Sequence, residues 1–417
     1  MKALDSLTES FDEEKRGRIL SLAKKYQLTD SQLLELLKNE ADLELWQEKS
    51  TLDILDYQLI DSRQGKRKAE ELVKEMRIYI DNLRYSPTDY STFNPPKIIR
   101  AKSEEEVFTD DSIKLMGKCP CPVDGEKTRC CKLTTLDAVS QCAFGCSYCS
   151  VQSFYSKNRI GVVSNLSQRL SNIDTEGIWH IGTGQASDSL LLGDSHGTLT
   201  SLSEFATSHP NIVIELKSKS PRRDFMENSF PRNMIFTWSL NAETIIKKEE
   251  HLTASLDERL ESARIMADKK NLVGFHIHPM VYFKGWQDEY RKVVEKITKT
   301  FSPDELCQIS FGTLTFTKAV LQHLRTHRTP SRVLCMPLVE AAGKYSYTLE
   351  IKREMFSTIY SYFPREFKEK VFFYLCMEDP SLWKTCLGRE YSCDKEFEED
   401  MKKHYLDKIR ASSFSRV

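Results

Sequence analysis

Short runs rich in β-branched and aromatic residues alternate with helical patterns through the middle of the chain. This alternation limits the possible folds more than any other feature. The clearest runs are LTTLDAV (133–139), GIWHIG (177–182), NIVIEL (211–216), MIFTWSL (234–240) and LVGFHIHPMVYF (272–283). Helical patterns such as LDERLESARIMADKK (256–270) lie between them. Strand, helix and strand repeated in this way predict an α/β fold with a parallel sheet or barrel of βαβ units. The later runs CQISFGTLTF, RVLCMPL and KVFFYLCME can extend the same sheet.

Polar clusters fall at or near the carboxyl ends of these predicted strands. They are GTGQASDS (182–189), KSKS (217–220), SLN (239–241) and HIHP (276–279), together with a cysteine-rich loop after the first strand. In parallel α/β folds the carboxyl ends of the strands form the active-site edge. We therefore expect these clusters to surround one site.

The cysteine-rich loop, CAFGCSYC, places Cys142, Cys146 and Cys149 in a C-x3-C-x2-C pattern. Four-cysteine sites close a cluster or a zinc ion, whereas three cysteines leave one coordination position open for a reacting molecule. The pattern therefore favours an iron-sulfur centre that does chemistry. A zinc site or a set of structural thiols is the alternative, because C-x2-C pairs commonly bind zinc.

The amino-terminal region has a different character. Apolar residues recur at helical spacing over Ile19–Leu37 and Lys68–Leu83, and the proline-rich segment SPTDYSTFNPPK (86–97) then breaks the pattern. We predict four parts, namely a helical region at 1–84, a linker at 85–117, a core barrel at 118–300 and a carboxyl-terminal α/β extension of the barrel at 301–417.

The charge balance excludes a general attraction to polyanions. Sixty Lys and Arg residues against sixty-one Asp and Glu give a net charge of -1, so any binding of nucleic acid must use a local patch. The amino terminus has no apolar leader, and no run of eighteen apolar residues occurs. We expect a cytoplasmic protein without a membrane partner, whose twelve cysteines serve in metal ligation, in catalysis or as buried free thiols.

The cysteine loop resembles the cluster loop of radical S-adenosylmethionine enzymes, and its neighbours resemble the spore photoproduct lyase branch of them. The collinear stretches are SYCSVQSFY, GTGQASDSL, IELKSKS, WSLN, TASLDERLESA, GFHIHPMVYFKGW, FGTLTF and YLCMEDPSLW. The resemblance runs from about Cys121 to Trp383 and leaves out the helical amino-terminal region.

This resemblance implies a partial (β/α) barrel with a helical amino-terminal appendage and a carboxyl-terminal extension. It also implies a [4Fe-4S] cluster on Cys142, Cys146 and Cys149, with S-adenosylmethionine chelating the fourth iron. Reductive cleavage of that cofactor gives a deoxyadenosyl radical, which such a lyase uses for repair of a DNA photolesion or modification of a nucleic acid base. A reductant such as flavodoxin or ferredoxin is the implied electron donor.

The resemblance also assigns roles to individual residues. Positions expected to contact the cofactor are Gly182, Gly184, Gln185, Ser187, Lys219, Ser239, Asn241 and the backbone near His278. Tyr148 or Phe144 is expected to limit water beside the cluster. Tyr148 and Gln185 are the candidate catalytic residues.

Two positions depart from the family pattern. Photoproduct lyases have a cysteine where Gln185 stands, and its thiol returns a hydrogen atom to the repaired thymine. The N–H bonds of Gln185 are too strong for that task, so this side chain is expected to bind the amino group of the cofactor. Of the two tyrosines that flank the third cluster cysteine in the family, Tyr148 is kept and Ser150 replaces the other. These departures leave the substrate open, and a peptide, a small molecule or a non-catalytic iron-sulfur or zinc protein remain alternatives.

The other cysteines and histidines allow two interpretations each. Cys119, Cys121, Cys130 and Cys131 can hold a second metal, form a redox pair or be inert thiols. The thiols nearer the carboxyl end, Cys307, Cys335, Cys376, Cys386 and Cys393, are typical of small buried hydrophobes. His276 and His278 face the same side of one strand, where hydrogen bonding inside a barrel is more common than metal binding.

Two basic segments also allow two interpretations each. TKAVLQHLRTHRTPSR (317–332) suits either a solvated helix face or a phosphate-binding patch. Gly343, Lys344, Tyr345 and Tyr347 suit either an ordinary loop or a hairpin that stacks on a flipped nucleotide.

Overall fold

The computed structural model describes residues 7–97, 106–119, 128–150, 159–327, 329–341 and 343–414. The chain divides into two compact units. The helical unit comprises Met1–Lys97, Tyr282–Lys284 and Ala319–Leu338, and the barrel unit comprises Ile98–Val281, Gly285–Lys318 and Val339–Val417. The four-part division drawn from the sequence stays a prediction.

The barrel unit is built on an eight-stranded sheet with the order β16-β12-β11-β9-β8-β7-β3-β2. The strands are β2 (Met116–Lys118), β3 (Thr134–Leu136), β7 (His180–Thr183), β8 (Val213–Ser218), β9 (Met234–Leu240), β11 (Val273–Met280), β12 (Leu306–Thr313) and β16 (Phe372–Leu375). All neighbours from β3 to β16 are parallel, and β2 is antiparallel to β3. This curled, mostly parallel sheet confirms the predicted partial (β/α) barrel.

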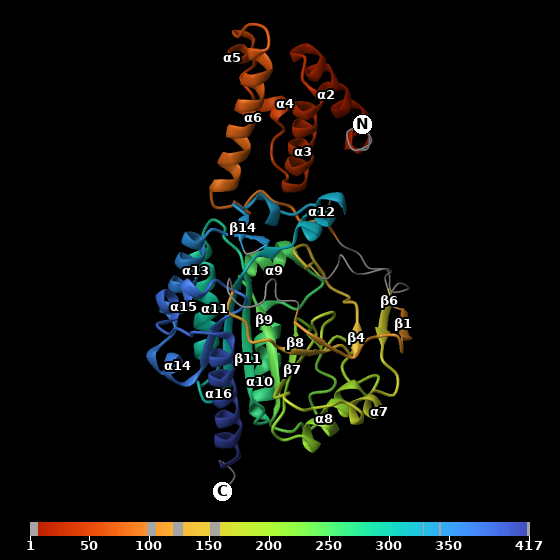
Figure 1. Ribbon diagram of the computed structural model, residues 1–417, viewed down its shortest axis with the longest axis vertical. Coiled ribbons are helices and arrows are strands. Elements are labelled where there is room, and N and C mark those ends of the chain that lie inside the picture. Colours follow the sequence, from red (N-terminus) through yellow and green to blue (C-terminus); the bar gives the residue numbers. More distant parts are fainter. Residues whose placement is uncertain are drawn as a thin grey trace. The chain divides into compact units, whose positions relative to one another are not determined.

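The strands form where the sequence is apolar almost without interruption, as expected of parallel strands covered on both sides. Every residue of β12 is buried, and so is every residue of β9 except Ser239. Helices α8 (Thr198–Ser208), α10 (Leu256–Asp268) and α11 (Trp286–Thr300) follow strands β7, β9 and β11. Helix α11 buries one apolar face, which includes Trp286, Tyr290 and Val293. In Figure 1, α10 and α11 run beside β9 and β11.

Helices near the β16 edge complete the barrel unit. They are α13 (Leu349–Tyr362), α14 (Arg365–Lys370), α15 (Pro380–Leu387) and α16 (Asp394–Phe414). The α16 side chains reach the amino ends of the strands, because Glu398 accepts a hydrogen bond from Trp179 (2.8 Å) and Lys408 donates one to the carbonyl of Pro303 (2.6 Å). Helix α16 therefore covers the end of the barrel opposite the predicted active-site edge.

Small elements surround this core. They are β1 (Glu106–Thr109), β4 (Val139–Ser140) and β6 (Arg159–Val162) in one sheet, β13 (Thr315–Phe316), β14 (Val339–Ala341) and β15 (Lys344–Ser346) in another, the pair β5 (Gly145–Cys146) and β10 (Glu250–His251), and helices α7 (Leu166–Ser171) and α9 (Glu243–Glu249). Within the described ranges, no helix combines the length and the apolar character needed to span a bilayer.

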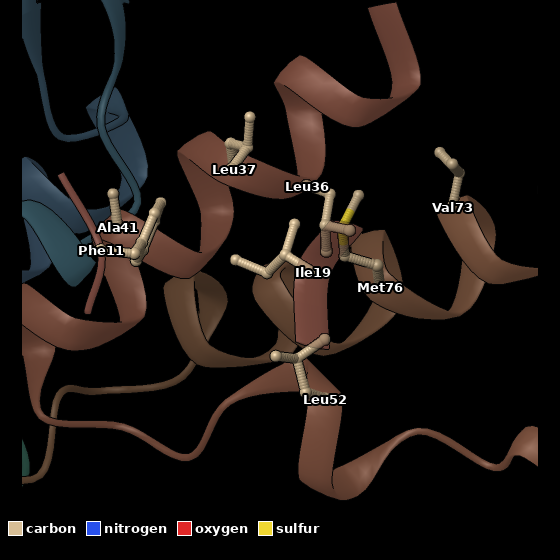
Figure 2. Close-up of a cluster of buried hydrophobic side chains, with 8 residues drawn as sticks. All are labelled: Phe11, Ile19, Leu36, Leu37, Ala41, Leu52, Val73 and Met76. Atoms are coloured by element: carbon tan, nitrogen blue, oxygen red, sulfur yellow. The ribbon is translucent and has the colours of Figure 1, made fainter. Parts of the chain in front are cut away.

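The helical unit contains α2 (Glu13–Tyr26), α3 (Asp30–Trp46), α4 (Thr51–Ile54), α5 (Tyr57–Asp61), α6 (Arg67–Tyr85), most of α12 (Lys318–His327) and the 3-10 turn η3 (Val333–Cys335). Figure 2 shows the apolar side chains that hold α2, α3, α4 and α6 together: Phe11, Ile19, Leu36, Leu37, Ala41, Leu52, Val73 and Met76. The unit thus has a hydrophobic core of its own.

Two sequence-based expectations were wrong here. The helical stretch Ile19–Leu37 is broken, because Gln27 adopts a left-handed conformation and Thr29 begins α3 with a capping box to Gln32. The run RVLCMPL does not extend the sheet but forms η3 in the helical unit. There Arg332 is buried and paired with Glu48 (2.9 Å), a contact within the helical unit that the local pattern does not reveal.

Candidate active site

Backbone pairing fixes the cysteine loop. Strand β5, which contains Cys146, pairs antiparallel with β10, so that Cys146 lies opposite Glu250. Next to it, the Ser147 amide donates to the carbonyl of Glu249 (2.8 Å) and the Cys149 amide donates to the carbonyl of Cys146 (3.0 Å). The loop is therefore held by the chain between α9 and α10, about a hundred residues away in sequence.

The three thiols lie near one another. Burial raises the pKa of the Cys146 thiol to about 12, and it raises that of Cys142 well above its ordinary value. The charges of Cys146 and Cys149 raise the pKa of Cys142 further, so the three sulfurs share one neighbourhood. Without a cation the thiols of Cys142 and Cys146 keep their protons, and binding of iron would release them.

The donor set fits a cluster with three protein ligands. Among the residues that the structure describes, no three His, Cys, Asp or Glu side chains converge as ligands of a single ion. A cluster attaches each thiolate to a different iron, so its sulfurs need not converge on one point. Thiolates are the soft ligands that iron-sulfur clusters take, and the buried rings of Phe144 and Tyr148 shield the loop from water.

Glu250 connects the cysteine loop to the strand ends. Its carboxylate is buried and lies 2.6 Å from Arg259 and 3.1 Å from Lys219. It also accepts hydrogen bonds from the Tyr148 hydroxyl and the Asn241 amide. Burial alone raises the pKa of Glu250, but the positive charges of Lys219 and Arg259 outweigh it and hold that pKa at about 2. The carboxylate is therefore charged at neutral pH.

Lys219 lies between Glu250 and the cysteines. Its amine donates to the Tyr148 hydroxyl (2.7 Å), lies 4.9 Å from the centre of that ring and is 4.0 Å from the sulfur of Cys146. The structure thus brings together three residues that sequence analysis singled out, Lys219, Tyr148 and Cys146. The expected contact of Lys219 with a cofactor stays a prediction.

The turn after β7 is tied to the end of β8. Gly184 has a φ of 77°, and a Cβ there would lie 2.9 Å from the carbonyl oxygen of Lys217, so glycine is required. A Cβ at Gly182 would lie 2.6 Å from a methyl group of Leu133. The buried Asp188 accepts hydrogen bonds from the Lys219 amide (2.6 Å) and the Ser218 hydroxyl (2.8 Å).

This arrangement holds the turn next to Lys219, with Gln185 and Ser187 partly exposed in it. The sequence predicted that both residues would lie on this turn. Their contacts with a cofactor stay predictions.

The ends of β9 and β11 carry the remaining predicted residues. The amide of Asn241 donates to Glu250 and to the carbonyl of Pro279 (2.9 Å), and its oxygen accepts from Tyr290 (2.7 Å). Asn241 is thus already paired within the protein, and the carbonyl of Ser239 accepts a hydrogen bond from Arg259 (2.7 Å). Whether either residue contacts a ribose stays a prediction.

The ring of His278 fills the space beside Gly312, where a Cβ would come within 2.7 Å of it. Burial is the main cause that lowers the pKa of His278, to about 3, with His276 and neighbouring lysines adding to the effect. His278 is therefore neutral at physiological pH.

The cysteine loop and these strand ends lie within residues 135–375, which match the family model for spore photoproduct lyase. The matched region is more than half of the 417 residues. The chain belongs to the spore photoproduct lyase family. Family membership makes it a radical S-adenosylmethionine enzyme of the lyase class, as the cysteine loop predicted.

Curated relatives in the spore photoproduct lyase family share parts of this sequence. The spore photoproduct lyase of Clostridium acetobutylicum is 23% identical over 232 residues, which are 54% of this chain and 68% of the relative. That of Bacillus subtilis is 34% identical over 76 residues, 18% of this chain and 22% of the relative. That of Geobacillus sp. is 27% identical over 142 residues, 32% and 41% of the two chains. The chain thus spans less than half of the length of two of these three relatives.

Solved structures of spore photoproduct lyase have the same fold. One, complexed with dinucleoside spore photoproduct, superposes with a TM-score of 0.53 at 20% identity, covering 66% of this chain and 83% of that chain. A mutant of spore photoproduct lyase gives 0.50 at 21% identity, covering 58% and 76%. At this level of identity the likeness establishes the fold.

Several site residues were missed by sequence analysis. Glu250 lies in the charged run KKEEH between two helices, which reads as solvated surface. Arg259 gave a usable signal, since it lies on the apolar stripe of α10 with Leu256, Leu260 and Ala263, where a charged residue needs a buried partner. Glu215 gave a similar signal as the acid inside NIVIEL.

Proposed function

We propose that this chain holds a [4Fe-4S] cluster on Cys142, Cys146 and Cys149 and cleaves S-adenosylmethionine to act on a photolesion in DNA. The observation that carries the proposal is the cysteine loop, in which three neighbouring thiols lie beside the Lys219–Glu250 ion pair (3.1 Å). Three protein ligands leave one iron open to the amino and carboxyl groups of the cofactor.

When bound, the cluster and cofactor supply radical chemistry that begins with removal of a hydrogen atom from the substrate. The chain binds and orients them. In this proposal the contacts come from the turn after β7 and from the ends of β8, β9 and β11, through Gly182, Gly184, Gln185, Ser187, Lys219, Ser239, Asn241 and the backbone near His278. Asn241, whose amide is already bonded, contributes chiefly by fixing Glu250.

Burial and nearby charges decide the protonation of Tyr148 and His278 in this site. Tyr148 is buried against Lys219 and keeps its proton, because burial and Glu250 raise its pKa well above the ordinary value. We propose that Tyr148 shields the cluster and positions the Lys219 amine. The ring of His278 is neutral, so it would add no second cation to the site that we propose for the cofactor.

Gln185 limits the final step of the reaction. A carboxamide offers no hydrogen atom that a carbon radical can take, because its N–H bonds are strong. We propose that Gln185 binds the amino group of the cofactor, and that the hydrogen atom which completes the product comes from another group.

The partner of the site is proposed to be nucleic acid. The relative with the bound dinucleoside spore photoproduct suggests this class of substrate. The hairpin β14–β15 carries Lys344 and Tyr345, a cation and an aromatic ring of the kind that contacts a flipped nucleotide. A flavodoxin or ferredoxin is the proposed electron donor, in the cytoplasm. A peptide or small molecule is the alternative substrate.

The cluster is tested by anaerobic reconstitution of the full chain. We expect bound iron, a visible absorption band from thiolate-to-iron charge transfer and release of deoxyadenosine after reduction. Cys146→Ala should lose all three, whereas Cys393→Ala, which changes an exposed thiol, should keep them. Retention of cofactor cleavage by Cys146→Ala contradicts the proposal. One zinc and no iron after anaerobic purification would favour a non-catalytic metal protein.

The substrate is tested by anaerobic turnover of irradiated DNA. Lesion reversal by the wild type supports the proposal, and Gln185→Cys measures what the thiol of the relatives adds. Binding to irradiated and unirradiated DNA over a salt series separates lesion recognition from general attraction to phosphate. Equal, salt-sensitive binding to both, without turnover, would instead favour a substrate other than DNA.

A further inference from the structure

Three thiols outside the cysteine loop meet in the barrel unit. The amide of Cys119, just after β2, donates to the carbonyl of Leu133 (2.9 Å), and that of Cys376, just after β16, donates to the carbonyl of Phe311 (2.8 Å). An antiparallel bridge joins Arg129 to Glu378. Cys131 and Cys376 each lie two residues from this bridge, and Cys131 is among the groups that raise the pKa of Cys376, so the two thiols are near each other.

These thiols share the space that holds Lys217. The charge of Lys217 lowers the pKa of Cys119, Cys131 and Cys376, which otherwise rises through burial. Each of the three cysteines is only partly buried. The amine of Lys217 has neither a hydrogen bond nor an ion pair to any residue in the described ranges. The three sulfurs and this amine therefore lie near one another in a partly exposed region of the barrel unit.

Cys376 lies at the active-site edge of the sheet. It follows the carboxyl end of β16, one strand beyond Gly312 of β12, and the ring of His278 from β11 occupies the space that a Gly312 side chain would fill. Cys376 and His278 thus both lie beside Gly312 at the strand ends. Lys344 of the hairpin is also close, because a thiolate at Cys376 would raise its pKa.

The thiols are protonated at neutral pH. Burial raises the pKa of Cys131 to about 12, and it raises that of Cys376 still further, with Cys131 and Cys119 adding to the effect. A protonated thiol keeps its S–H bond, which is weak enough to give a hydrogen atom to a carbon radical. Gln185 has no such bond.

We propose that Cys376, next to Cys131, is the hydrogen-atom donor that completes the reaction in place of the residue at position 185. The S–H bond of Cys376 breaks homolytically, the hydrogen atom bonds to the substrate carbon radical, and a thiyl radical stays on the sulfur. One electron from a reductant of the flavodoxin or ferredoxin class and one proton from solvent restore the thiol. This inference rests on the proposed function and adds the identity of the donor.

The proximity of Cys131 and Cys376 is tested by oxidising the protein without cluster or cofactor. Diamide oxidises two neighbouring thiols to a disulfide and is itself reduced by the two hydrogens that they lose. Peptide mapping should find a Cys131–Cys376 disulfide in the wild type and in Cys393→Ala, and none in Cys376→Ala. Failure to join these two cysteines in the folded wild type overturns the proposed pairing.

The chemistry is tested with dinucleoside spore photoproduct in D2O, because thiol hydrogens exchange with solvent. The wild type and Cys393→Ala should form repaired product that carries one solvent deuterium. Cys376→Ala should still release deoxyadenosine but form at least about tenfold less deuterated product. Cys376→Ser, which restores polarity without a weak bond, should not rescue it.

Equal product from Cys376→Ala and Cys393→Ala overturns the donor assignment while leaving the proposed function intact. Absence of product from the wild type, with the cofactor cleaved, contradicts the proposed substrate, and the donor assignment then falls with it.

Discussion

Two buried glutamates organise the barrel unit, and they are held in different ways. Glu250, with Lys219, Arg259, Tyr148 and Asn241, forms what we call the rim network at the cysteine loop. Glu215, with His180, His276, Thr237 and Gln308, forms the lumen network inside the barrel. Both carboxylates are fully buried.

The difference lies in the partners. Glu250 contacts two side chains that are cations at every physiological pH, whereas Glu215 contacts histidines and amide or hydroxyl groups. Burial lowers the pKa of His276, so its ring is neutral in the folded protein at pH 7. The rim network is thus fixed by permanent charge, and the lumen network by hydrogen bonds that depend on pH. The cysteine loop is attached to the rim network, whose charges do not change with pH in this range.

The largest expected effect follows from neutralising the rim carboxylate. Glu250→Gln leaves Arg259, which has no exposed side chain, without its counter-ion and should lower the free energy of unfolding by about 3–5 kcal/mol. Urea unfolding followed by circular dichroism measures it. Glu243→Gln, which changes a half-exposed glutamate on the neighbouring α9, should change stability by less than about 0.5 kcal/mol.

The matched change in the lumen should cost less. Glu215→Gln keeps an acceptor oxygen for only one of His180 and His276, which contact different oxygens of the carboxylate. It leaves no permanently charged side chain in direct contact without a partner, so we expect a loss of about 1–3 kcal/mol. The same urea titration applies. A loss as large as that of Glu250→Gln would break the comparison, since it would mean that Glu215 also neutralises fixed charge, with Lys217 the nearest candidate.

A third prediction concerns pH. Below the ordinary histidine pKa of 6.5 the unfolded chain binds a proton that folded His276 does not, so stability falls as pH is lowered from 7 to 5. A fully developed difference contributes about 1.4 kcal/mol per pH unit for one such histidine. His276→Gln should reduce the slope, whereas Glu250→Gln should lower the whole curve and leave its slope in this window unchanged, because the folded pKa of Glu250 is about 2. Equal slopes in wild type and His276→Gln would contradict this account.

The smallest effect is expected at the start of α10, the helix that carries Arg259. Ser255 caps this helix in a capping box with Glu258. Ser255→Ala should reduce the free energy of unfolding by about 1 kcal/mol without altering iron loading, because Arg259 is also held by the carbonyls of Ala254 and Ser239. Loss of bound iron in Ser255→Ala would show that the rim network depends on this cap.

The sequence predicted the barrel well because parallel strands are encoded locally. MIFTWSL forms β9 with the bounds expected from its apolar run, and Gly184 sits where a positive φ is required. The cysteine spacing predicted the cluster loop for the same reason. The rim and lumen networks depend instead mainly on partners far apart in the sequence, 22 positions in Thr237–Glu215 and 102 in Tyr148–Glu250, and no local pattern carries such pairings. Their nearest partners, Asn241 and Arg259, each lie nine positions from Glu250.

RVLCMPL is a segment that sequence analysis wrongly predicted as a strand. It has the composition of a strand, but Arg332 and Cys335 find partners in the helical unit, where they bind the carbonyls of Asp89 and Leu83. Tertiary contacts decided the conformation of this run against its propensity. Cys121, singled out in the sequence, lies outside the described residues.

Helix α16 has a consequence for synthesis of the protein. Tyr405 donates a hydrogen bond to Gln308 of the lumen network, and Glu398 accepts one from Trp179, which lies 219 positions earlier in the chain. During synthesis, the strands of the barrel therefore leave the ribosome before α16, the helix that covers the end of the barrel opposite the active-site edge. Until α16 emerges, these two hydrogen bonds are missing, and we expect the nascent barrel to be more prone to aggregation.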